Sequence, residues 1–218
     1  MSYLPNEKTL ELNVISSLLD FVRQNGHPQA YAYGFTLSYE GRRGLDSSIE
    51  LSPHFSMIAF QFKKVHSLNP PTFVFNFNNN KARNQHNLIC DAARAAGSIR
   101  SIFYALPAFE NTTDLATKSP NFLDDTYVID PLDIGYINDG QPHEFVINVR
   151  NGTYAVHSDR PRKTGKTQSL KSLFMKFDDK TIGINVAKFQ QNLQSISDEI
   201  NSRSRSIPAR INPKAIIV

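Results

Sequence analysis

A predicted hairpin constrains this chain more than any other feature. Residues 44–63, GLDSSIELSPHFSMIAFQFK, contain one stretch that alternates polar and apolar residues over 48–51 and a second, apolar stretch that ends in alternating Phe-Gln-Phe-Lys at 60–63, separated by Ser-Pro-His at 52–54. Alternation with a period of two is typical of a strand with two unlike faces, and Ser and Pro favour a turn. We therefore expect two antiparallel strands, with the other elements arranged around them.

The same alternation brings three polar side chains together. Gln61 and Lys63 share one face of the second strand, and the face of the first strand that carries Asp46 can meet them across the hairpin. A carboxylate, an amide and an ammonium suit a divalent metal and a phosphate, because oxygens bind Mg²⁺ and a cation stabilises an oxyanion. Alternatively, all three lie on the exposed face of a strand and have no chemical role.

A helix is predicted over residues 7–24, EKTLELNVISSLLDFVRQ, because apolar residues recur there at spacings of three and four. Gly26 is expected to end it. Glu11 falls on the inward side of this helix. It is either a partly exposed first-turn acid favoured by the helix dipole or a carboxylate that contributes to a metal site.

Further strands and a second helix are predicted up to residue 106. Residues 30–40 are rich in aromatic residues and fit either a strand or a helical turn, whereas 72–78, TFVFNFN, alternate as a third strand. Residues 84–96 predict a helix, and the apolar run 98–106 predicts a buried strand. Strand, helix and strand in succession imply a right-handed crossover.

The pattern weakens beyond residue 107. We expect a loop with one helical turn over 110–125, a basic loop over 160–171 and a helix over 182–202. Strands are expected at 127–129, 143–149 and 154–157, the last two joined as a hairpin by Asn151-Gly152.

Basic residues are concentrated toward the C-terminus. Residues 160–218 carry 12 Lys and Arg against 4 Asp and Glu, a formal charge of +8, whereas residues 1–159 carry −4. This asymmetry indicates a surface for a polyanion, although a basic tail can also be solvated or contact a protein. A single cysteine, Cys90, excludes an internal disulfide and suits a reducing compartment. Without a long apolar run or a signal peptide, we expect a cytoplasmic protein that makes no membrane contact.

Several common motifs are absent from the sequence. Gly165-Lys166-Thr167 is similar to the end of a phosphate-binding loop, but Arg160 stands where that motif needs a glycine. The six histidines are scattered without the spacing of a zinc site. Neither a G-x-S-x-G nucleophile pattern nor an RNA-recognition pattern is present.

The order of elements over roughly residues 7–106 resembles the PD-(D/E)xK nuclease superfamily. That superfamily carries an Asp near the start of one strand and (D/E)-x-K on the next, or Q-x-K in a branch of restriction and antiviral defence nucleases. Asp46, in Gly44-Leu45-Asp46, is similar to the first motif, and Gln61-Phe62-Lys63 is similar to the second. Glu11 stands where many members have a helix carboxylate, and Gln85-His86 is similar to the polar start of the following helix.

The resemblance implies an α/β fold with a restriction-endonuclease-like core: helix, three strands, helix and strand around a mixed sheet. This core would span residues 1–108, with added strands, a basic loop and a helix over 109–203 and a basic arm over 204–218. The implied activity is cleavage of DNA phosphodiester bonds with Mg²⁺ or Mn²⁺, in a prokaryotic restriction or antiviral defence system. RNA remains an alternative substrate.

The resemblance also implies roles for particular residues. Asp46 would hold the metal, aided by Glu11 or by Glu40, which could instead pair with a neighbouring arginine in an exposed turn. Gln61 would complete the metal shell, as a weaker ligand than a carboxylate, and Lys63 would stabilise the attacking hydroxide. The residues expected to contact the nucleic-acid backbone are Arg42, Arg43, Arg160, Arg162, Lys163, Lys166 and Lys171.

Two other classes of function are compatible with the sequence. The chain could be a non-catalytic subunit with the same fold that docks on nucleic acid or on a larger protein of a defence complex. It could also be an assembly protein with a basic arm. We expect the protein to form a homo-oligomer.

Overall fold

The first helix, α1 (Glu7–Gln24), has the predicted bounds. Its N-cap residue Asn6 accepts a hydrogen bond from the backbone N–H of Thr9, which satisfies one of the free donors of the first turn. Apolar residues at helical spacing, among them Leu10, Val14 and Leu18, are buried against the sheet. In this computed structural model the described residues are 3–34, 45–51, 56–76, 82–97, 100–119, 121–137, 143–157, 161–176, 183–185, 188, 191–192 and 195.

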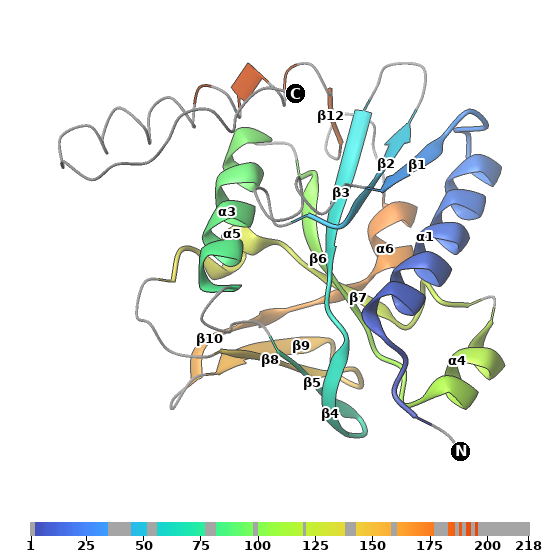
Figure 1. The fold of residues 1–218 in the computed structure, drawn as a ribbon, viewed down its shortest axis with the longest axis vertical. Helices are drawn as coiled ribbons and strands as arrows, with labels where there is room; N and C mark the ends of the chain where they lie inside the picture. The colour runs from blue at the N-terminus through green and yellow to red at the C-terminus, as the bar shows by residue number, and fades with distance from the viewer. Residues whose placement is uncertain are drawn as a thin grey trace, which may run out of the picture.

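The larger sheet is mixed, as predicted, and the fold is α/β (Figure 1). Its strands run in the order β1-β2-β3-β6-β7-β11, and β12 pairs with the start of β3. Neighbours are antiparallel except for β3 and β6, which are parallel. The strands are β1 (Tyr31–Gly34), β2 (Ser47–Leu51), β3 (Ser56–Phe62), β6 (Ile102–Pro107), β7 (Thr126–Ile129), β11 (Gln168–Ser169) and β12 (Ile184–Asn185).

The predicted hairpin is formed by β2 and β3, with Ile49 opposite Ile58. The stretch 30–40, for which strand and helix were both open, supplies β1 beside β2. The chain leaves β3 for the second sheet and returns through α3 (Ala82–Ala95) to the parallel strand β6. The predicted helix and buried strand before residue 106 are thus confirmed.

The second sheet is antiparallel, with the order β10-β9-β8-β5-β4. It corrects the expectation that residues 72–78 form the third strand of the core, because 72–76 form β5 in this other sheet. β5 alternates buried Phe73 and Phe75 with more exposed residues, and it pairs with β8 rather than with the hairpin. The strands are β4 (Val65–Asn69), β5 (Thr72–Asn76), β8 (Glu144–Asn148), β9 (Thr153–His157) and β10 (Pro161–Lys166).

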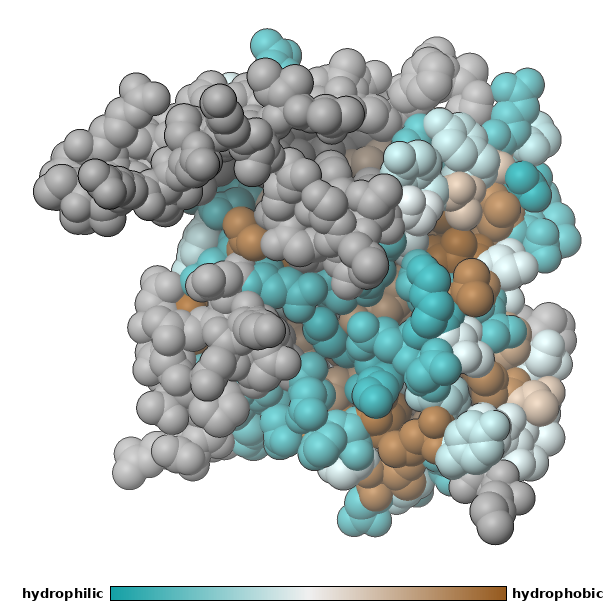
Figure 2. Space-filling model, in the orientation of Figure 1, coloured by the Kyte–Doolittle hydropathy of each residue, from teal (hydrophilic) through white to brown (hydrophobic). Residues whose placement is uncertain are grey.

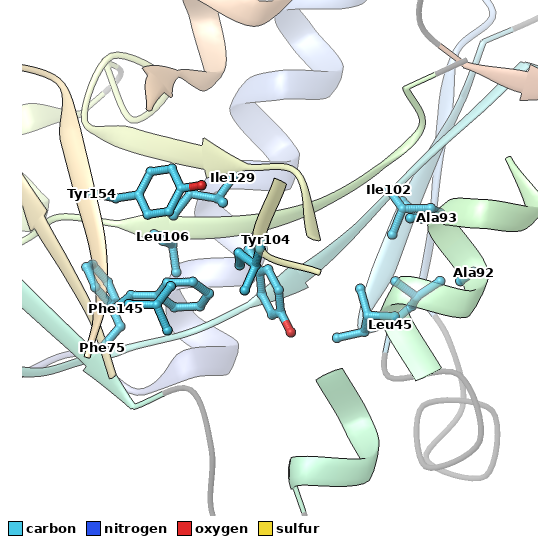
Figure 3. Close-up of a cluster of buried hydrophobic side chains, with 14 of the residues drawn as sticks. Leu45, Phe75, Ala92, Ala93, Ile102, Tyr104, Leu106, Ile129, Phe145 and Tyr154 are labelled. Carbon is cyan, nitrogen blue, oxygen red and sulfur yellow. The ribbon is translucent and has the colours of Figure 1, made fainter. Parts of the chain in front are cut away.

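Two apolar clusters cover the two faces of the larger sheet. One joins α1 and α6 (Leu170–Met175) to the face that carries Ile58, Phe60 and Phe62. The other joins α3 and the second sheet to the opposite face. Tyr104 lies between the two halves of this second cluster, with Phe75 and Phe145 on one side and Leu45 and Ile102 on the other (Figure 3).

The C-terminal half contains two errors of prediction. Residues 160–171 were expected to be a basic loop, but β10, β11 and the start of α6 lie within 161–171. β10 is an edge strand that pairs with β9, and edge strands tolerate the lysines that hide the alternation. The expected strands at 127–129, 143–149 and 154–157 are confirmed, as is a helix within 110–125, α4 (Thr112–Lys118).

The predicted helix 182–202 does not begin where expected, because 184–185 form β12 against β3. Lys188, Gln191, Asn192 and Ser195 are helical, and the rest of this stretch lies outside the described residues, as does the arm 204–218. The remaining helix is α5 (Pro131–Ile134). Within the part of the chain that the structure describes, no helix is long and apolar enough to cross a membrane.

Candidate functional site

Asp46 and Gln61 meet across the hairpin, as their alternation predicted. Asp46 comes just before β2, and its backbone N–H donates to the carbonyl of Phe60 on β3. The side-chain nitrogen of Gln61 donates to Asp46 Oδ2 at 2.7 Å. Both side chains are buried. A buried carboxylate needs such donors, because without them it would lose its hydration with no compensation.

A second donor fixes Asp46 in place. The backbone N–H of Phe62 donates to the same Oδ2 at 2.6 Å, a charge-assisted hydrogen bond. The amide nitrogen of Gln61 also donates to the carbonyl oxygen of Phe62 at 3.0 Å. Two oxygens, one from a carboxylate and one from the backbone, therefore converge on a single NH₂ group at the end of β3.

Gln85, in the first turn of α3, connects this pair to Lys63. Its side-chain nitrogen donates to Gln61 Oε1 at 3.0 Å, and its Oε1 accepts from Lys63 Nζ at 3.1 Å. Lys63 directly follows β3, and its backbone N–H donates to the carbonyl of Ala105 on β6. The three residues of the predicted motif are thus held in one hydrogen-bonded chain, Lys63 to Gln85 to Gln61 to Asp46.

Gln85 appeared in the sequence only as part of a polar helix start, and its contact with both motif residues was missed. Lys63 and Gln85 are 22 positions apart, and the hairpin of β4 and β5 lies between them. A signal was present in the sequence, since an uncharged polar residue opens a helix that leads into the parallel strand. That signal does not specify the partner.

A buried layer behind the chain holds α3 in position. In the parallel register Gln61 lies beside Tyr104 of β6, whose hydroxyl contacts His86 Nδ1 at 2.9 Å. His86 Nε2 lies 2.8 Å from the carbonyl oxygen of Gly135. Since a carbonyl only accepts, Nε2 carries the proton, and Nδ1 accepts from Tyr104. Burial lowers the pKa of His86 to about 4, so the ring is neutral near pH 7.

Glu11 is buried on α1, where it pairs with Lys8 at 2.9 Å. One turn earlier, Glu7 accepts from the backbone N–H of Lys64 at 3.2 Å, which ties the start of α1 to the residue after Lys63. Glu11 lies on the inward side, as its spacing predicted, and it is buried rather than partly exposed. A role in metal binding stays a prediction. Glu40, the other expected metal carboxylate, lies outside the described residues.

Three of the expected nucleic-acid contacts are described, and they lie on β10 and α6. Lys163 Nζ on β10 donates to the carbonyl of Ile134 at 3.3 Å, and Lys171 on α6 pairs with Asp124 at 2.9 Å. Lys166 is exposed and lines a hollow of about 290 Å³ that Arg100 also lines. The other expected contacts, Arg42, Arg43, Arg160 and the side chain of Arg162, lie outside the described residues.

The chemistry available at this site is defined by one carboxylate, two amides, one carbonyl and one ammonium. Among the described residues no cluster of three or more His, Cys, Asp or Glu side chains could hold a metal ion. Comparisons of the chain with protein-family profiles, with curated proteins and with solved structures found no match.

Proposed function

We propose that this chain is a metal-dependent endonuclease that cleaves DNA phosphodiester bonds, as the nuclease component of a prokaryotic restriction or antiviral defence system. The observation that carries the proposal is the convergence of Asp46, Gln61 and Lys63 at the end of β3. Three residues chosen from sequence for one chemistry are joined there through a single bridging side chain. Exposed strand residues without a chemical role would not be joined by hydrogen bonds, and Asp46 and Gln61 would not be buried.

The arrangement of elements around these residues supports the same proposal. The order α1, β1, β2, β3, α3 and β6 is the succession of helix, three strands, helix and strand that the PD-(D/E)xK resemblance implies. Asp46 precedes β2, and the Q-x-K motif ends β3, so the two motifs lie on neighbouring strands. Strands β4 and β5 interrupt this order and belong to the second sheet.

The donor set fits a hard divalent cation once the Gln61 amide is turned over. The Asp46 carboxylate and the Phe62 carbonyl already converge on the nitrogen of Gln61, at 2.7 and 3.0 Å. If the amide turns over, its oxygen joins them, and three oxygens of the type preferred by Mg²⁺ and Mn²⁺ face one point. A bound cation would polarise the phosphate and acidify an attacking water.

Lys63 would act as the electrostatic catalyst in this proposal. Its ammonium is a mobile point charge at the end of a flexible stem, suited to the charge that develops on phosphorus in the transition state. The Asp46 carboxylate would bind the cation. The hydrogen bond that it accepts from the Phe62 N–H keeps it in one position. Gln61 would supply a neutral oxygen, so the site carries less negative charge than one built on two acids.

Basic side chains of the protein would bind the backbone phosphates of the nucleic acid. Lys166 is exposed on β10, and Figure 2 shows a broad hydrophilic area across the centre of the drawn face. Contacts of this kind release counterions, so binding should weaken steeply with salt and carry little sequence information. The proposal includes that Lys166 and the other basic residues contact DNA that lies at the Asp46 site.

A second candidate function is a non-catalytic subunit that docks on nucleic acid or on a larger complex. The observation in its favour is that the amide nitrogen of Gln61 stands between the two oxygens, with one carboxylate in contact with it. A protein that had abandoned catalysis could keep this neutral, fully bonded arrangement for stability alone.

The deciding experiment is cleavage of plasmid and linear DNA with Mg²⁺ or Mn²⁺. We expect Lys63→Ala and Asp46→Asn to reduce the rate by at least about 100-fold, the usual cost of losing one group that stabilises transition-state charge. Lys64→Ala is the matched control, because it removes the adjacent exposed lysine while keeping the backbone bond to Glu7. If Lys63→Ala cuts as fast as wild type, or if wild type does not cut in the absence of a partner, the docking subunit is favoured.

A further inference from the structure

The chain from Lys63 to Asp46 has a fixed direction. An ammonium group can only donate hydrogen bonds, and an ionised carboxylate can only accept them. Each amide between them must therefore accept from the lysine side and donate toward the aspartate side. The observed contacts follow this order at 3.1, 3.0 and 2.7 Å. Neither amide can turn over alone without placing two donors, or two acceptors, against each other.

The amide hydrogens of Gln61 point at the two oxygens that a cation would bind. The amide nitrogen lies within hydrogen-bonding distance of both Asp46 Oδ2 and the Phe62 carbonyl oxygen. A divalent ion that binds these two oxygens repels these hydrogens, because an N–H group is a donor and cannot be a metal ligand. Rotation of the Gln61 amide removes the repulsion, because it turns the nitrogen toward Gln85 and presents the amide oxygen to the ion.

That rotation is transmitted to Lys63. Once the Gln61 nitrogen points at Gln85, Gln85 can meet it only by turning its own oxygen toward Gln61. The Gln85 nitrogen then faces the Lys63 ammonium, and the acceptor that holds Lys63 is lost. The backbone of Gln85 cannot move instead, because the neighbouring residues of α3 are bonded to the segment around residues 135–137.

We propose that Gln85 is a positioning residue that couples cation binding at Asp46 and Gln61 to the release of Lys63. This inference rests on the proposed function and adds an order of events to it. Without a cation, Lys63 is bonded to Gln85 and withheld from substrate. With a cation, both amides turn over, and the ammonium becomes free to approach a phosphate.

The test is the acylation rate of Lys63 by a water-soluble N-hydroxysuccinimide ester of acetic acid, followed by peptide mass spectrometry. The full-length protein is labelled in EDTA and then with Mg²⁺ or Ca²⁺, without nucleic acid. Lys64 is adjacent and exposed, so it serves as the internal standard. We expect the ratio of Lys63 to Lys64 labelling to rise several-fold with the cation. An unchanged ratio, with cation binding demonstrated by calorimetry, would overturn the inference.

Two variants of Gln85 separate positioning from a structural role. Gln85→Leu cannot hold Lys63 or oppose the rotation of Gln61, so Lys63 should label fast with or without a cation. The cation should also bind about tenfold tighter, the equivalent of one hydrogen bond of about 1.4 kcal/mol. Gln85→Glu accepts from both Lys63 and the rotated Gln61, so binding should tighten while Lys63 labels slowly in both conditions. If both variants change labelling in the same direction, Gln85 has only a structural role.

The outcome also distinguishes failure of this inference from failure of the proposed function. If wild type neither binds a divalent cation nor cuts DNA, the nuclease proposal fails, and the coupling fails with it. If wild type binds the cation and cuts, but Lys63 labelling ignores both the cation and the Gln85 substitutions, only the coupling is refuted. Thermal unfolding of each variant shows that the labelling differences come from folded protein.

Discussion

Replacing Gln61 by glutamate tests the central contact of the site, because it exchanges one NH₂ donor for an acceptor with almost no change of shape. In wild type this nitrogen donates to Asp46 Oδ2 at 2.7 Å and to the Phe62 carbonyl at 3.0 Å. The ionised carboxylate of the Gln61→Glu variant would direct a negative oxygen at both. The variant should therefore be destabilised without a cation and rescued with one.

The size of the effect follows from the distance. Two unit charges 2.7 Å apart repel by about 6 kcal/mol at an effective dielectric constant of about 20. Protonation limits the destabilisation to less than this repulsion, because one carboxyl of the pair can stay protonated. Keeping that proton costs about 1.4 kcal/mol for each pH unit above the ordinary glutamate pKa of about 4.3. At about pH 7.5 that cost is about 4 kcal/mol, so we expect a loss of unfolding free energy of about 2 to 4 kcal/mol.

The sign of the pH dependence is specific. The substitution raises the folded pKa of a carboxyl above its unfolded value, so the protonated form is favoured in the folded state. The stability of the Gln61→Glu variant is therefore retained below about pH 4 and lost as pH rises. Urea unfolding of the variant and wild type from about pH 4 to 8, in EDTA and with Mg²⁺, measures the difference between them. Gln61→Met, which removes the donor without adding a charge, is the control. Parallel pH profiles of wild type and Gln61→Glu would refute the contact as described.

Two further predictions concern the support of the site. Burial lowers the folded pKa of His86 from 6.5 to about 4, so its contribution to stability is present above pH 6.5 and is lost as pH falls toward 4. Wild type should lose about 3 kcal/mol of unfolding free energy over this window because of this group. His86→Gln should reduce the slope of unfolding free energy against pH by the equivalent of up to one proton. An unchanged slope would contradict a neutral buried ring. Gly165→Ala should destabilise by about 1 to 3 kcal/mol in urea unfolding, because its Cβ would lie 2.5 Å from the Tyr154 ring. Combining it with Tyr154→Ala should make the alanine at 165 nearly neutral, and an equal loss in both backgrounds would place the cause elsewhere.

The hairpin and the contact between Asp46 and Gln61 were predictable because both depend on short-range alternation. A strand presents every second residue to one face, and a tight turn sets which residues are opposite. Glu11 was placed inward for the same reason, since helical periodicity decides which side of α1 is buried. These predictions need no knowledge of the rest of the chain.

Features set by long-range pairing could not be predicted in this way. The alternation of residues 72–76 indicates a strand, but the same pattern fits either sheet, and pairing with β8 decides the matter. β10 was mistaken for a loop because an edge strand can carry lysines at positions where a central strand needs apolar residues. The contact of Gln85 with Lys63 depends on where the intervening β4–β5 hairpin leaves α3, which no local pattern records.

The insertion of β4 and β5 between β3 and α3 has a consequence for biosynthesis. Asp46 and Gln61 are 15 residues apart in one hairpin, so their contact needs only a short loop to close. The contact of Lys63 with Gln85 depends on the hairpin of β4 and β5, and β5 pairs with β8, which begins at residue 144. A chain emerging from the ribosome can therefore complete the anionic half of the site long before its lysine is held in place. If the protein cuts DNA, its unfinished chains carry only half of the site.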